Sequence, residues 1–252
     1  MKNDFLLYLD ILGFEHLCLE CDPKVEAIYA CLLETKRNHK SAYKIVIFSD
    51  TVLIQNVGLS DPLYSLMFLC EFFTDLQYRL SKLQIFLRGV IKNGLFTMER
   101  RGDVEVFYGP AIIAAYKAEK TIKAVGLFIC KSCSPFNQIH KLTHHDEKYD
   151  FVQTLISVVT HSEMQIGSAQ IPMFCLTETD DFCFLVDDVE LLKQISKYRL
   201  DTQQPEIQLK HETTWQLIRK CNSQLLDSLE AGHFDMKVVN DEFDWSQSGM
   251  YR

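Results

Sequence analysis

Apolar runs, separated by short polar segments, divide the first part of the chain into a regular series of elements. Residues 4–12 read as a buried strand, because an apolar run from Phe5 to Leu9 ends in Asp10 and is followed by further apolar residues. Residues 23–39 carry apolar side chains at helical spacing. Residues 43–56 contain two β-branched runs on either side of Ser49 and Asp50, which is the pattern of a hairpin. The pattern therefore predicts a strand, a helix and a hairpin in that order.

The pattern continues as far as residue 130. A helix, two strands, a second helix and a further strand are predicted at residues 60–84, 85–98, 104–109, 109–122 and 124–130. The first six elements of the whole series match the ferredoxin-like βαββαβ unit, which polymerase palms and nucleotide cyclases share. We therefore predict an α+β fold with a central antiparallel sheet, although a fold alone does not give a function.

The signal weakens in the second half of the chain. Residues 140–150 are polar and are expected to form a loop or a short helix. Residues 182–188 read as a strand, and helices are predicted at residues 189–198 and 206–230. The segment after Gly232 is expected to be an irregular tail.

Length and composition are those of a protein with a sizeable core. The chain has 252 residues, of which 47% are hydrophobic. We expect residues 1–133 to form the core and residues 134–252 to form an α/β extension that completes the same domain.

The net charge of −8 argues against a broad surface for nucleic acid or membrane lipid. No signal peptide or apolar run long enough to span a bilayer is visible, so we expect a soluble cytoplasmic protein.

Nine cysteines are present, an odd number that does not suggest a disulfide framework. Two Cys-x-x-Cys pairs occur, Cys18 with Cys21 and Cys130 with Cys133. They could bind zinc, or they could be reduced thiols that pack as small apolar groups. The pairs lie more than a hundred residues apart and lack the glycine-rich flanks of a zinc ribbon, which favours the second interpretation.

Two acidic residues are the first candidates for chemistry. Asp10 ends the first strand and Asp50 occupies the turn of the hairpin. In a βαββ arrangement these strands are neighbours, so the two carboxylates would converge and repel unless a cation lay between them. Mg²⁺ suits such a site because it takes few protein carboxylates and fills its remaining positions with water and substrate phosphates. The alternatives are that Asp10 caps the following helix and that Asp50 is an ordinary turn residue.

Four segments stand in order along the chain: LDILGF at residues 9–14, FSDTVLI at 48–54, LRGVIKNGLF at 87–96 and YGPAIIAAYKAEK at 108–120. Together they resemble the catalytic domain of class III nucleotidyl cyclases. The resemblance points to the bacterial branch that includes the pyrimidine cyclases of anti-phage Pycsar systems. It covers about residues 4–130, half of the chain.

The resemblance implies a metal centre and a phosphate-binding turn. Asp10 and Asp50 match the metal-binding aspartates of the family, with the backbone carbonyl of Ile11 as a further ligand for Mg²⁺ or Mn²⁺, two ions per site. The turn that would cradle the triphosphate with its backbone amides consists of Leu12, Gly13 and Phe14. Amides at a strand-to-helix turn favour anions, and a glycine lets a phosphate approach closely.

The sequence departs from the family at the positions that read the base and bind the ribose. Purine cyclases carry a lysine and an aspartate where this chain has Val46 and Val106, so the usual reading of a purine edge is missing. Ile113 replaces the asparagine of the helix, and Lys117 replaces the arginine that stabilises the transition state. Lysine keeps the charge of arginine but loses its bidentate fork.

Further candidates come from the long strand and from the first strand of the hairpin. Arg88 and Lys92 share one face of their strand and are candidates for phosphate binding, with a salt bridge as the alternative for Arg88. Tyr43 and Phe48 could narrow an apolar base pocket around Val46. A narrow apolar wall would favour a pyrimidine.

The resemblance therefore implies a nucleotidyl cyclase that converts a ribonucleoside triphosphate, UTP before CTP, to a 3′,5′-cyclic monophosphate and pyrophosphate. It also implies a homodimer with two shared sites, in which one chain supplies the metals and the other supplies Lys117. The product would act as a diffusible anti-phage signal on a separate effector. The alternative from another class is a degenerate, cyclase-like module that binds a nucleotide without turning it over. A diguanylate cyclase is disfavoured because IFSDTV stands where that family has its Gly-Gly hairpin.

Overall fold

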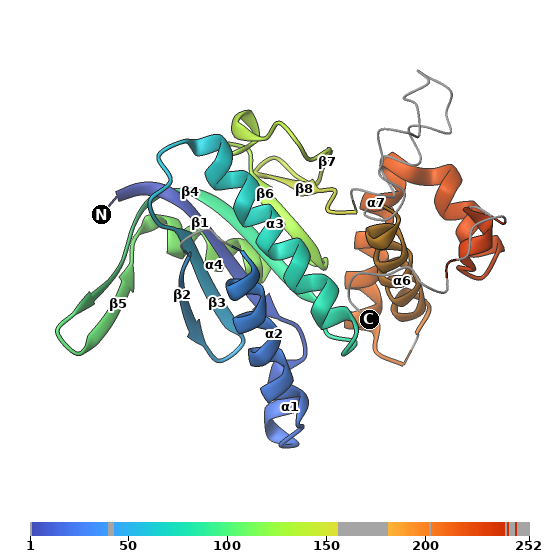
Figure 1. Cartoon of the computed structure of the whole chain (residues 1–252), viewed down its shortest axis with the longest axis horizontal. Coiled ribbons are helices and arrows are strands. Elements are labelled where there is room, and N and C mark those ends of the chain that lie inside the picture. The colour runs from blue at the N-terminus through green and yellow to red at the C-terminus, as the bar shows by residue number, and fades with distance from the viewer. Residues whose placement is uncertain are drawn as a thin grey trace. The chain divides into compact units, whose positions relative to one another are not determined.

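The computed structural model forms two compact units, Met1–Thr154 and Leu155–Arg252 (Figure 1). The structure describes residues 2–39, 43–155, 181–201, 203–239, 241 and 245. The strands of the first unit are β1 Lys2–Ile11, β2 Tyr43–Phe48, β3 Thr51–Asn56, β4 Leu87–Arg101, β5 Val104–Tyr108, β6 Gly126–Cys130, β7 Leu142–His144 and β8 Tyr149–Val152. Its helices are α1 Phe14–Leu19, α2 Lys24–Asn38, α3 Pro62–Ser81, α4 Pro110–Thr121 and the short 3₁₀ helix η1 Ser134–Phe136.

One sheet organises the first unit. Its strand order is β2-β3-β1-β4-β6-β8-β7, and β5 pairs with the end of β4 outside this path. The order β2-β3-β1-β4, with antiparallel pairing throughout, is that of the predicted βαββαβ unit. Strand β6 then joins β4 in parallel, so the sheet as a whole is mixed. The predicted α+β fold is confirmed, and the acid-bearing strands β1 and β3 are neighbours as expected.

The two faces of the sheet are covered by different helices, α3 on one face and α4 on the other (Figure 1). The residues of β4 show which face is which. A Cβ atom on Gly89 would lie 2.8 Å from the ring of Phe73 on α3, whereas one on Gly94 would lie 3.2 Å from Ala111 on α4. Because side chains alternate along a strand, the even-numbered residues Arg88 and Lys92 project toward α4.

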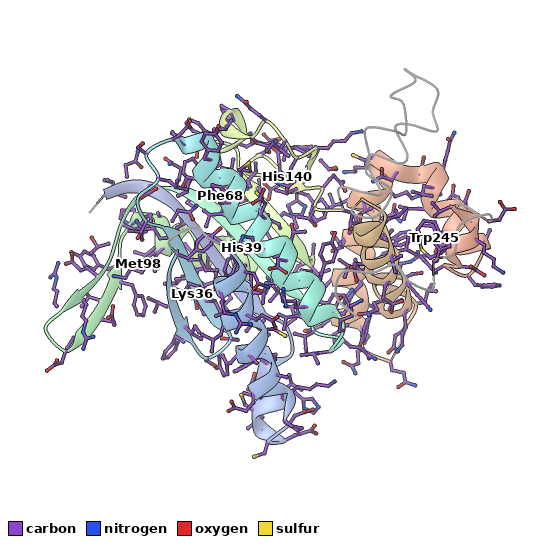
Figure 2. The ribbon with its side chains drawn as sticks, viewed as in Figure 1. Lys36, His39, Phe68, Met98, His140 and Trp245 are labelled. Atoms are coloured by element: carbon purple, nitrogen blue, oxygen red, sulfur yellow. The ribbon has the colours of Figure 1, made fainter. Side chains whose placement is uncertain are left out.

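The α3 face forms the apolar core of this unit. His39, at the end of α2, places its ring 5.6 Å from Phe72 and lies 3.3 Å from Asp75 (Figure 2). Tyr43 packs against Phe72 at 4.9 Å, and its hydroxyl donates to the carbonyl of Phe68 at 2.8 Å. Tyr43 is thus committed to the α3 face, and the expectation that it narrows a pocket around Val46 is wrong. Neighbouring residues of β2 alternate, so Phe48 shares the face of Val46.

Strand β4 is long enough to serve two partners. It pairs with β1 as far as Phe96 and with β5 from Thr97 onward. The Lys44 ammonium of β2 donates to the carbonyl of Met98 at 2.6 Å, so β2 is tied to the base of the β4–β5 hairpin (Figure 2). The hairpin extends beyond the main sheet and leaves the apolar side chains of β5 exposed, including Val104 and Phe107.

Strands β7 and β8 lie within a segment that is polar in sequence. They pair with each other, and β8 pairs with β6, so both belong to the sheet of the first unit. The expectation of a loop or short helix over residues 140–150 is wrong for these strands. The reason is that β7 is a short edge strand, and edge strands tolerate the polar residues that mask a strand pattern.

The second unit is helical in the part that the structure describes. It contains α6 Asp181–Leu200, α7 Pro205–Ala231 and the 3₁₀ helix η3 Met236–Val238. The strand predicted at residues 182–188 is wrong, because this run belongs to α6. An apolar run of this length fits either state, and the helical spacing of the buried residues Leu185, Val189 and Leu192 decides for the helix.

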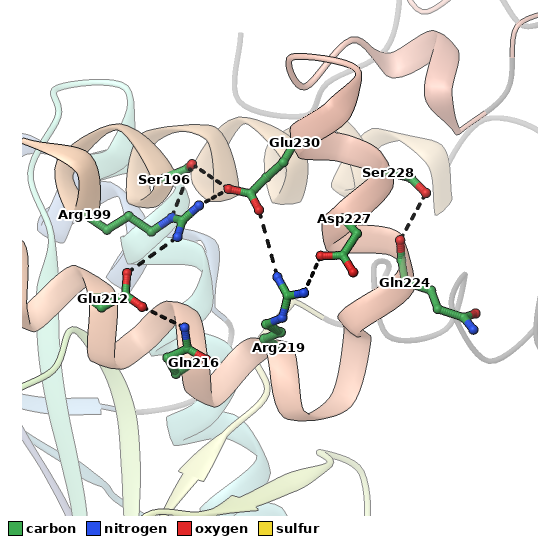
Figure 3. Close-up of polar contacts among 9 residues, drawn as sticks. All are labelled: Ser196, Arg199, Glu212, Gln216, Arg219, Gln224, Asp227, Ser228 and Glu230. Carbon is green, nitrogen blue, oxygen red and sulfur yellow. Dashed lines mark hydrogen bonds and ion pairs between the residues drawn. The ribbon is translucent and has the colours of Figure 1, made fainter.

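An arginine-centred network joins α6 to α7 (Figure 3). The Arg199 guanidinium contacts Glu230 and lies 3.5 Å from Glu212, and it stacks 4.3 Å above the ring of the fully buried Trp215. Helix α7 is kinked at Asn222, where φ is −134°. The Arg219 guanidinium, before the kink, lies 4.0 Å from the Glu230 carboxylate beyond it. None of the helices in the described residues is long and apolar enough to cross a bilayer.

Candidate functional site

The two aspartates meet where β1 ends beside the β2–β3 turn. Asp10 is the penultimate residue of β1 and is 8% exposed. Its neighbours across the sheet are Thr51 on β3 and Arg88 on β4. Asp50 is partly buried in the turn, and its carbonyl accepts a hydrogen bond from the amide of Ile11 at 2.9 Å. This bond fixes the turn against the end of β1, so the sheet brings the two acids together. Asp10 and Asp50 are hereafter called the acid pair.

A buried arginine neutralises part of this charge. Arg88 is 5% exposed and donates to the Asp10 carboxylate at 2.7 Å. It also contacts Glu119 of α4, and it donates to the backbone carbonyl of Ile122 at 2.8 Å. Arg88 therefore lies at the acid pair, in the ion-pair arrangement that was the alternative to phosphate binding.

The electrostatics of Asp10 show an excess of acid over base. Burial raises the pKa of the Asp10 carboxyl above its usual range, and the charges of Glu119 and Asp50 raise it further, while the Arg88 guanidinium lowers it. Three carboxylates thus act around the Arg88 guanidinium, with the exposed Lys120 ammonium 3.3 Å from Glu119 as the second cation. A divalent cation would relieve this excess, because an opposite charge within a few ångströms favours the ionised carboxylate.

The residues present fit a Mg²⁺ or Mn²⁺ site of the two-carboxylate kind. Asp10 and Asp50 would supply carboxylate oxygens and Ile11 a backbone carbonyl, with water and phosphate oxygens completing the coordination. No group of three or more His, Cys, Asp or Glu side chains suited to a metal occurs within the described residues. A cation bound here would therefore depend on the substrate for part of its coordination.

The turn after β1 has a conformation that requires glycine. Gly13 has φ of +78°, and an added Cβ atom would meet no neighbour, so backbone conformation rather than space selects glycine here. The amide of Leu12 donates to the carbonyl of Phe86 at 3.0 Å and is occupied in this structure. Phe14 begins the short helix α1 and is buried. A phosphate cradle at this turn stays a prediction, now centred on Gly13 and Phe14.

A second polar region of this unit is a basic cavity of about 450 Å³, hereafter called the lysine cavity. Its lining residues are Lys92, Ala114, Lys117, Ala118, Thr121, Cys130, Lys131, Ser132, Lys148 and Tyr149. Four of them are lysines and none is an acid. Such a cavity favours a polyanionic group through the summed field of its cations.

The lysines of this cavity differ in whether a carboxylate of the same chain pairs with them. Lys131 pairs with Asp150. In the part of the chain that the structure describes, Lys92, Lys117 and Lys148 have no carboxylate partner within 4.0 Å. The cavity therefore brings together the two predicted phosphate ligands, Lys92 and Lys117, and adds a third cation with an unmatched charge.

The acid pair and the lysine cavity are separated along the strand that they share. Asp10 lies opposite Arg88, and Lys92 is four residues further along β4, which corresponds to about 13 Å. Both regions are on the α4 face. A single chain thus carries the predicted metal ligands and the predicted phosphate ligands at different places.

The predicted base-reading positions lie on exposed elements. Val46 is partly buried on β2, and Val106 is partly buried on the β5 hairpin. Ile113 is 56% exposed on α4, one turn before Lys117. Of these three side chains, Ile113 is exposed and the two valines are partly buried.

Sequence reasoning missed three contributors. Glu119 falls on the buried stripe of α4 together with Ala111 and Ala115, so a charged residue on an apolar stripe was the available signal. Lys131 and Lys148 come together because the amide of Lys131 donates to the carbonyl of Lys148 at 2.8 Å. That contact requires the β6–β8 pairing, which the polar segment at residues 140–148 concealed.

Comparisons with known proteins give structural likeness only. No protein-family model matches the chain, and no curated protein matches it in sequence. The fold is similar to a monomeric guanylyl cyclase domain of the RhoGC fusion protein from the aquatic fungus Blastocladiella emersonii, with TM-score 0.47, 16% identity, and 60% of this chain and 95% of that chain covered. It is also similar to the guanylate cyclase domain of RhGC from Catenaria anguillulae, solved with GTP, at TM-score 0.46 and 12% identity, with 60% and 96% covered. A bacterial light-regulated adenylyl cyclase gives TM-score 0.45 and 10% identity, with 60% and 90% covered.

Proposed function

We propose that this protein is a metal-dependent nucleotidyl cyclase that makes a 3′,5′-cyclic monophosphate and pyrophosphate from a ribonucleoside triphosphate. The observation that carries the proposal is the acid pair, Asp10 and Asp50, on the same sheet face as the lysine cavity. Carboxylates for a divalent cation and cations for phosphate oxygens are what phosphoryl transfer requires, because its catalysis is mostly positioning and charge stabilisation. The four cyclase-like segments of the sequence support the same conclusion.

In this reaction the 3′-hydroxyl attacks the α-phosphorus in line and pyrophosphate leaves. Asp10 and Asp50 would hold the ions, whose chemistry when bound is to lower the pKa of the 3′-hydroxyl and to stabilise the leaving group. Gly13, with its positive φ, forms the turn beside them. The amides of Gly13 and Phe14 would donate hydrogen bonds to phosphate oxygens there. Arg88 holds Asp10 in position and limits the repulsion of the acids before substrate binds.

The lysine cavity would supply the charge that develops in the transition state. Lys117 is exposed at its rim and is our first candidate for contact with the reacting phosphate, with Lys92 and Lys148 holding the remaining oxygens. Lys92 lies about 13 Å along the sheet from Asp10 of its own chain. The proposal therefore includes a second copy of the chain, so that the acids of one copy face the lysines of the other.

Several exposed apolar side chains support this homodimer. Apolar side chains on β2, the end of β4, β5 and α4 are exposed, namely Ile47, Phe48, Leu95, Val104, Phe107, Tyr108, Ile113 and Tyr116. Phe48 is 73% exposed and Val104 is 60% exposed. Exposed large apolar residues of this kind are what a second subunit would cover. A symmetric pair would contain two equivalent sites.

The identity of the nucleobase is the most detailed part of the proposal. Val46 and Val106 cannot hydrogen-bond a purine edge, and Phe48 adds bulk on the face of Val46. Apolar fit discriminates by only about 1–3 kcal/mol, so selectivity between UTP and CTP requires polar groups as well. We propose a pyrimidine triphosphate, UTP before CTP, and a cytoplasmic, anti-phage role in which the cyclic product acts on a separate effector.

The test is incubation of the purified protein with equal concentrations of the four ribonucleoside triphosphates and Mn²⁺ or Mg²⁺, followed by mass spectrometry of the products. A cyclic pyrimidine monophosphate supports the whole proposal. Cyclic AMP or cyclic GMP as the dominant product overturns the pyrimidine assignment and keeps the cyclase. Absence of any cyclic product, together with metal-dependent nucleotide binding by calorimetry, would favour the degenerate binding module, for which Ile113 in place of the family asparagine is the specific observation.

A further inference from the structure

The wall of the lysine cavity contains a pair of cysteines that the proposed cyclase reaction does not use. Cys130 is the last residue of β6 and lines the cavity, and Cys133 follows in the turn that leads into η1. Their sulfur atoms are 3.1 Å apart. Both residues are free cysteines in this structure.

The backbone holds these two residues in a geometry suited to a disulfide. The amide of Cys133 donates to the carbonyl of Cys130 at 2.7 Å and closes a four-residue turn. In such a turn the first and last Cα atoms lie within about 7 Å, which overlaps the range of about 4.4–6.8 Å found in disulfides. A bond would bring the sulfur atoms about 1 Å closer, and the turn already fixes their approach.

The surroundings make the two thiols unequal. A hydrogen bond from Cys133 and a second from Ser132 at 2.9 Å stabilise a Cys130 thiolate, and the nearby Lys92 charge favours it as well. These contacts lower the pKa of Cys130 to about 5 despite its burial. The hydrogen bond to Cys130 and burial raise the pKa of Cys133, which therefore keeps its proton. This division resembles that of a nucleophilic thiolate with a protonated resolving partner.

We propose that Cys130 and Cys133 form a redox-active dithiol that small hydroperoxides convert to a disulfide in the wall of the lysine cavity. Access favours this order of events, because Cys130 lines the cavity while Cys133 has no exposed surface. The site takes a small oxidant, since Cys130 itself is only 3% exposed.

The chemistry balances with hydrogen peroxide as the oxidant. The Cys130 thiolate attacks one peroxide oxygen, an S–O bond forms, the O–O bond breaks, and the departing hydroxide takes a proton to become water. Cys133 then loses its proton, and its sulfur attacks the Cys130 sulfenic acid. An S–S bond forms, the S–O bond breaks, and a second water leaves. The two sulfurs lose two electrons and the peroxide gains them.

The experiment uses the full-length reduced protein, graded hydrogen peroxide, quenching with N-ethylmaleimide and peptide mass spectrometry without reduction. We expect the peptide that contains Cys130 and Cys133 to lose two hydrogens and to escape alkylation. This should occur at about tenfold lower peroxide than is needed to oxidise the exposed Cys18 and Cys21. The Cys18→Ser/Cys21→Ser double variant is the matched Cys-x-x-Cys control and should keep the effect in full.

Two further variants test the order of the steps. Cys133→Ser should trap a Cys130 sulfenic acid that dimedone labels, and Cys133→Ala gives a second version if the serine variant does not fold. Cys130→Ser should abolish both the disulfide and the label. Alkylation of both cysteines in the wild-type protein, while glutathione in the same tube is oxidised, would overturn the proposal. A stable sulfenic acid in the wild-type protein without a disulfide would overturn the pairing.

Discussion

The acid pair and the lysine cavity lie on the same face of one sheet, but they differ in burial and in charge balance. Asp10 is buried and has two acidic neighbours, with Arg88 as its only cationic contact within hydrogen-bonding distance among the described residues. Lys117 is exposed at the rim of a cavity that contains no acid. Neither region is electrically balanced within its own chain. A nucleoside triphosphate with divalent cations carries both the positive charge that the acids lack and the negative charge that the lysines lack.

The difference also separates structural charges from those that we propose act in catalysis. Arg88 and Glu119 are buried and bound to each other, so their first effect is on stability. Lys117 has no such partner and contributes little to the fold. Substitutions in the two regions should therefore have opposite profiles in stability and in activity.

The largest effect is expected from removal of the acid pair. Asp10→Ala and Asp50→Ala should each lower cyclisation by about 1,000-fold or more, because metal-ion stabilisation of the transition state is worth several kcal/mol. Thermal stability should hold or rise, since Arg88 still has Glu119 as a partner. Product formation is measured by mass spectrometry and unfolding by circular dichroism. The matched control is Asp103→Ala, which removes an exposed aspartate from the turn of the β4–β5 hairpin. Wild-type turnover in the Asp10→Ala or the Asp50→Ala variant would refute the metal assignment.

Arg88→Met should give the largest loss of stability. It leaves Asp10 buried without its base and Glu119 with only the exposed Lys120, and breaking a buried ion pair from one side costs about 3–5 kcal/mol. Chemical denaturation measures the free energy of unfolding. Arg100→Met removes an exposed arginine from the same strand and should change that free energy by less than about 0.5 kcal/mol. Equal effects of the two variants would show that the buried cluster is not a structural element.

Lys117→Ala should lower kcat by about 10- to 100-fold with a smaller change in KM, because its charge is needed mostly in the transition state. Lys117→Arg should recover much of the loss, since the charge is kept. The matched control is Lys36→Ala, which removes an exposed lysine from α2 (Figure 2). Steady-state kinetics provide the measurement. A rise in KM at constant kcat would instead assign Lys117 to ground-state binding.

The smallest effect concerns pH. The pKa of Asp10 is raised in the folded chain above its ordinary value of 3.8. Between pH 3.8 and the folded pKa, the folded protein therefore binds more protons than the unfolded one. The contribution of Asp10 to stability is then present at low pH and is lost as pH rises through the folded pKa. Asp10→Asn should flatten this part of the stability curve, and Asp103→Asn should leave it unchanged. A steeper fall in the Asp10→Asn variant would contradict the direction of the shift.

The sequence predicts the fold best where side-chain pattern and turn chemistry agree. The hairpin around Ser49 and Asp50 is an example, because a positive φ at Ser49 and β-branched strands coincide. The strand predicted at residues 182–188 fails because a short apolar run is compatible with either state. Strands β7 and β8 were missed because both are short, the segment around β7 is polar, and their pairing is set by β6.

In the candidate site, too, the sequence predicts what local pattern determines and misses what tertiary packing determines. The meeting of Asp10 and Asp50 was predictable because adjacent strands place both acids at one edge of the sheet. The engagement of Arg88 was not predictable in full, because its partner Glu119 belongs to a helix whose packing on the sheet the sequence does not specify. The lysine cavity depends on the β6–β8 register, and no pattern in the sequence carries that register.

The most direct test of the account mixes two impaired variants. Asp50→Ala and Lys117→Ala proteins are combined under conditions of demonstrated subunit exchange, and product is compared with each variant alone. If the acids of one chain face the lysines of the other, half of the dimers carry one intact site, and about a quarter of wild-type activity should return. Complete exchange without any gain in activity would contradict a site shared between two copies of this chain.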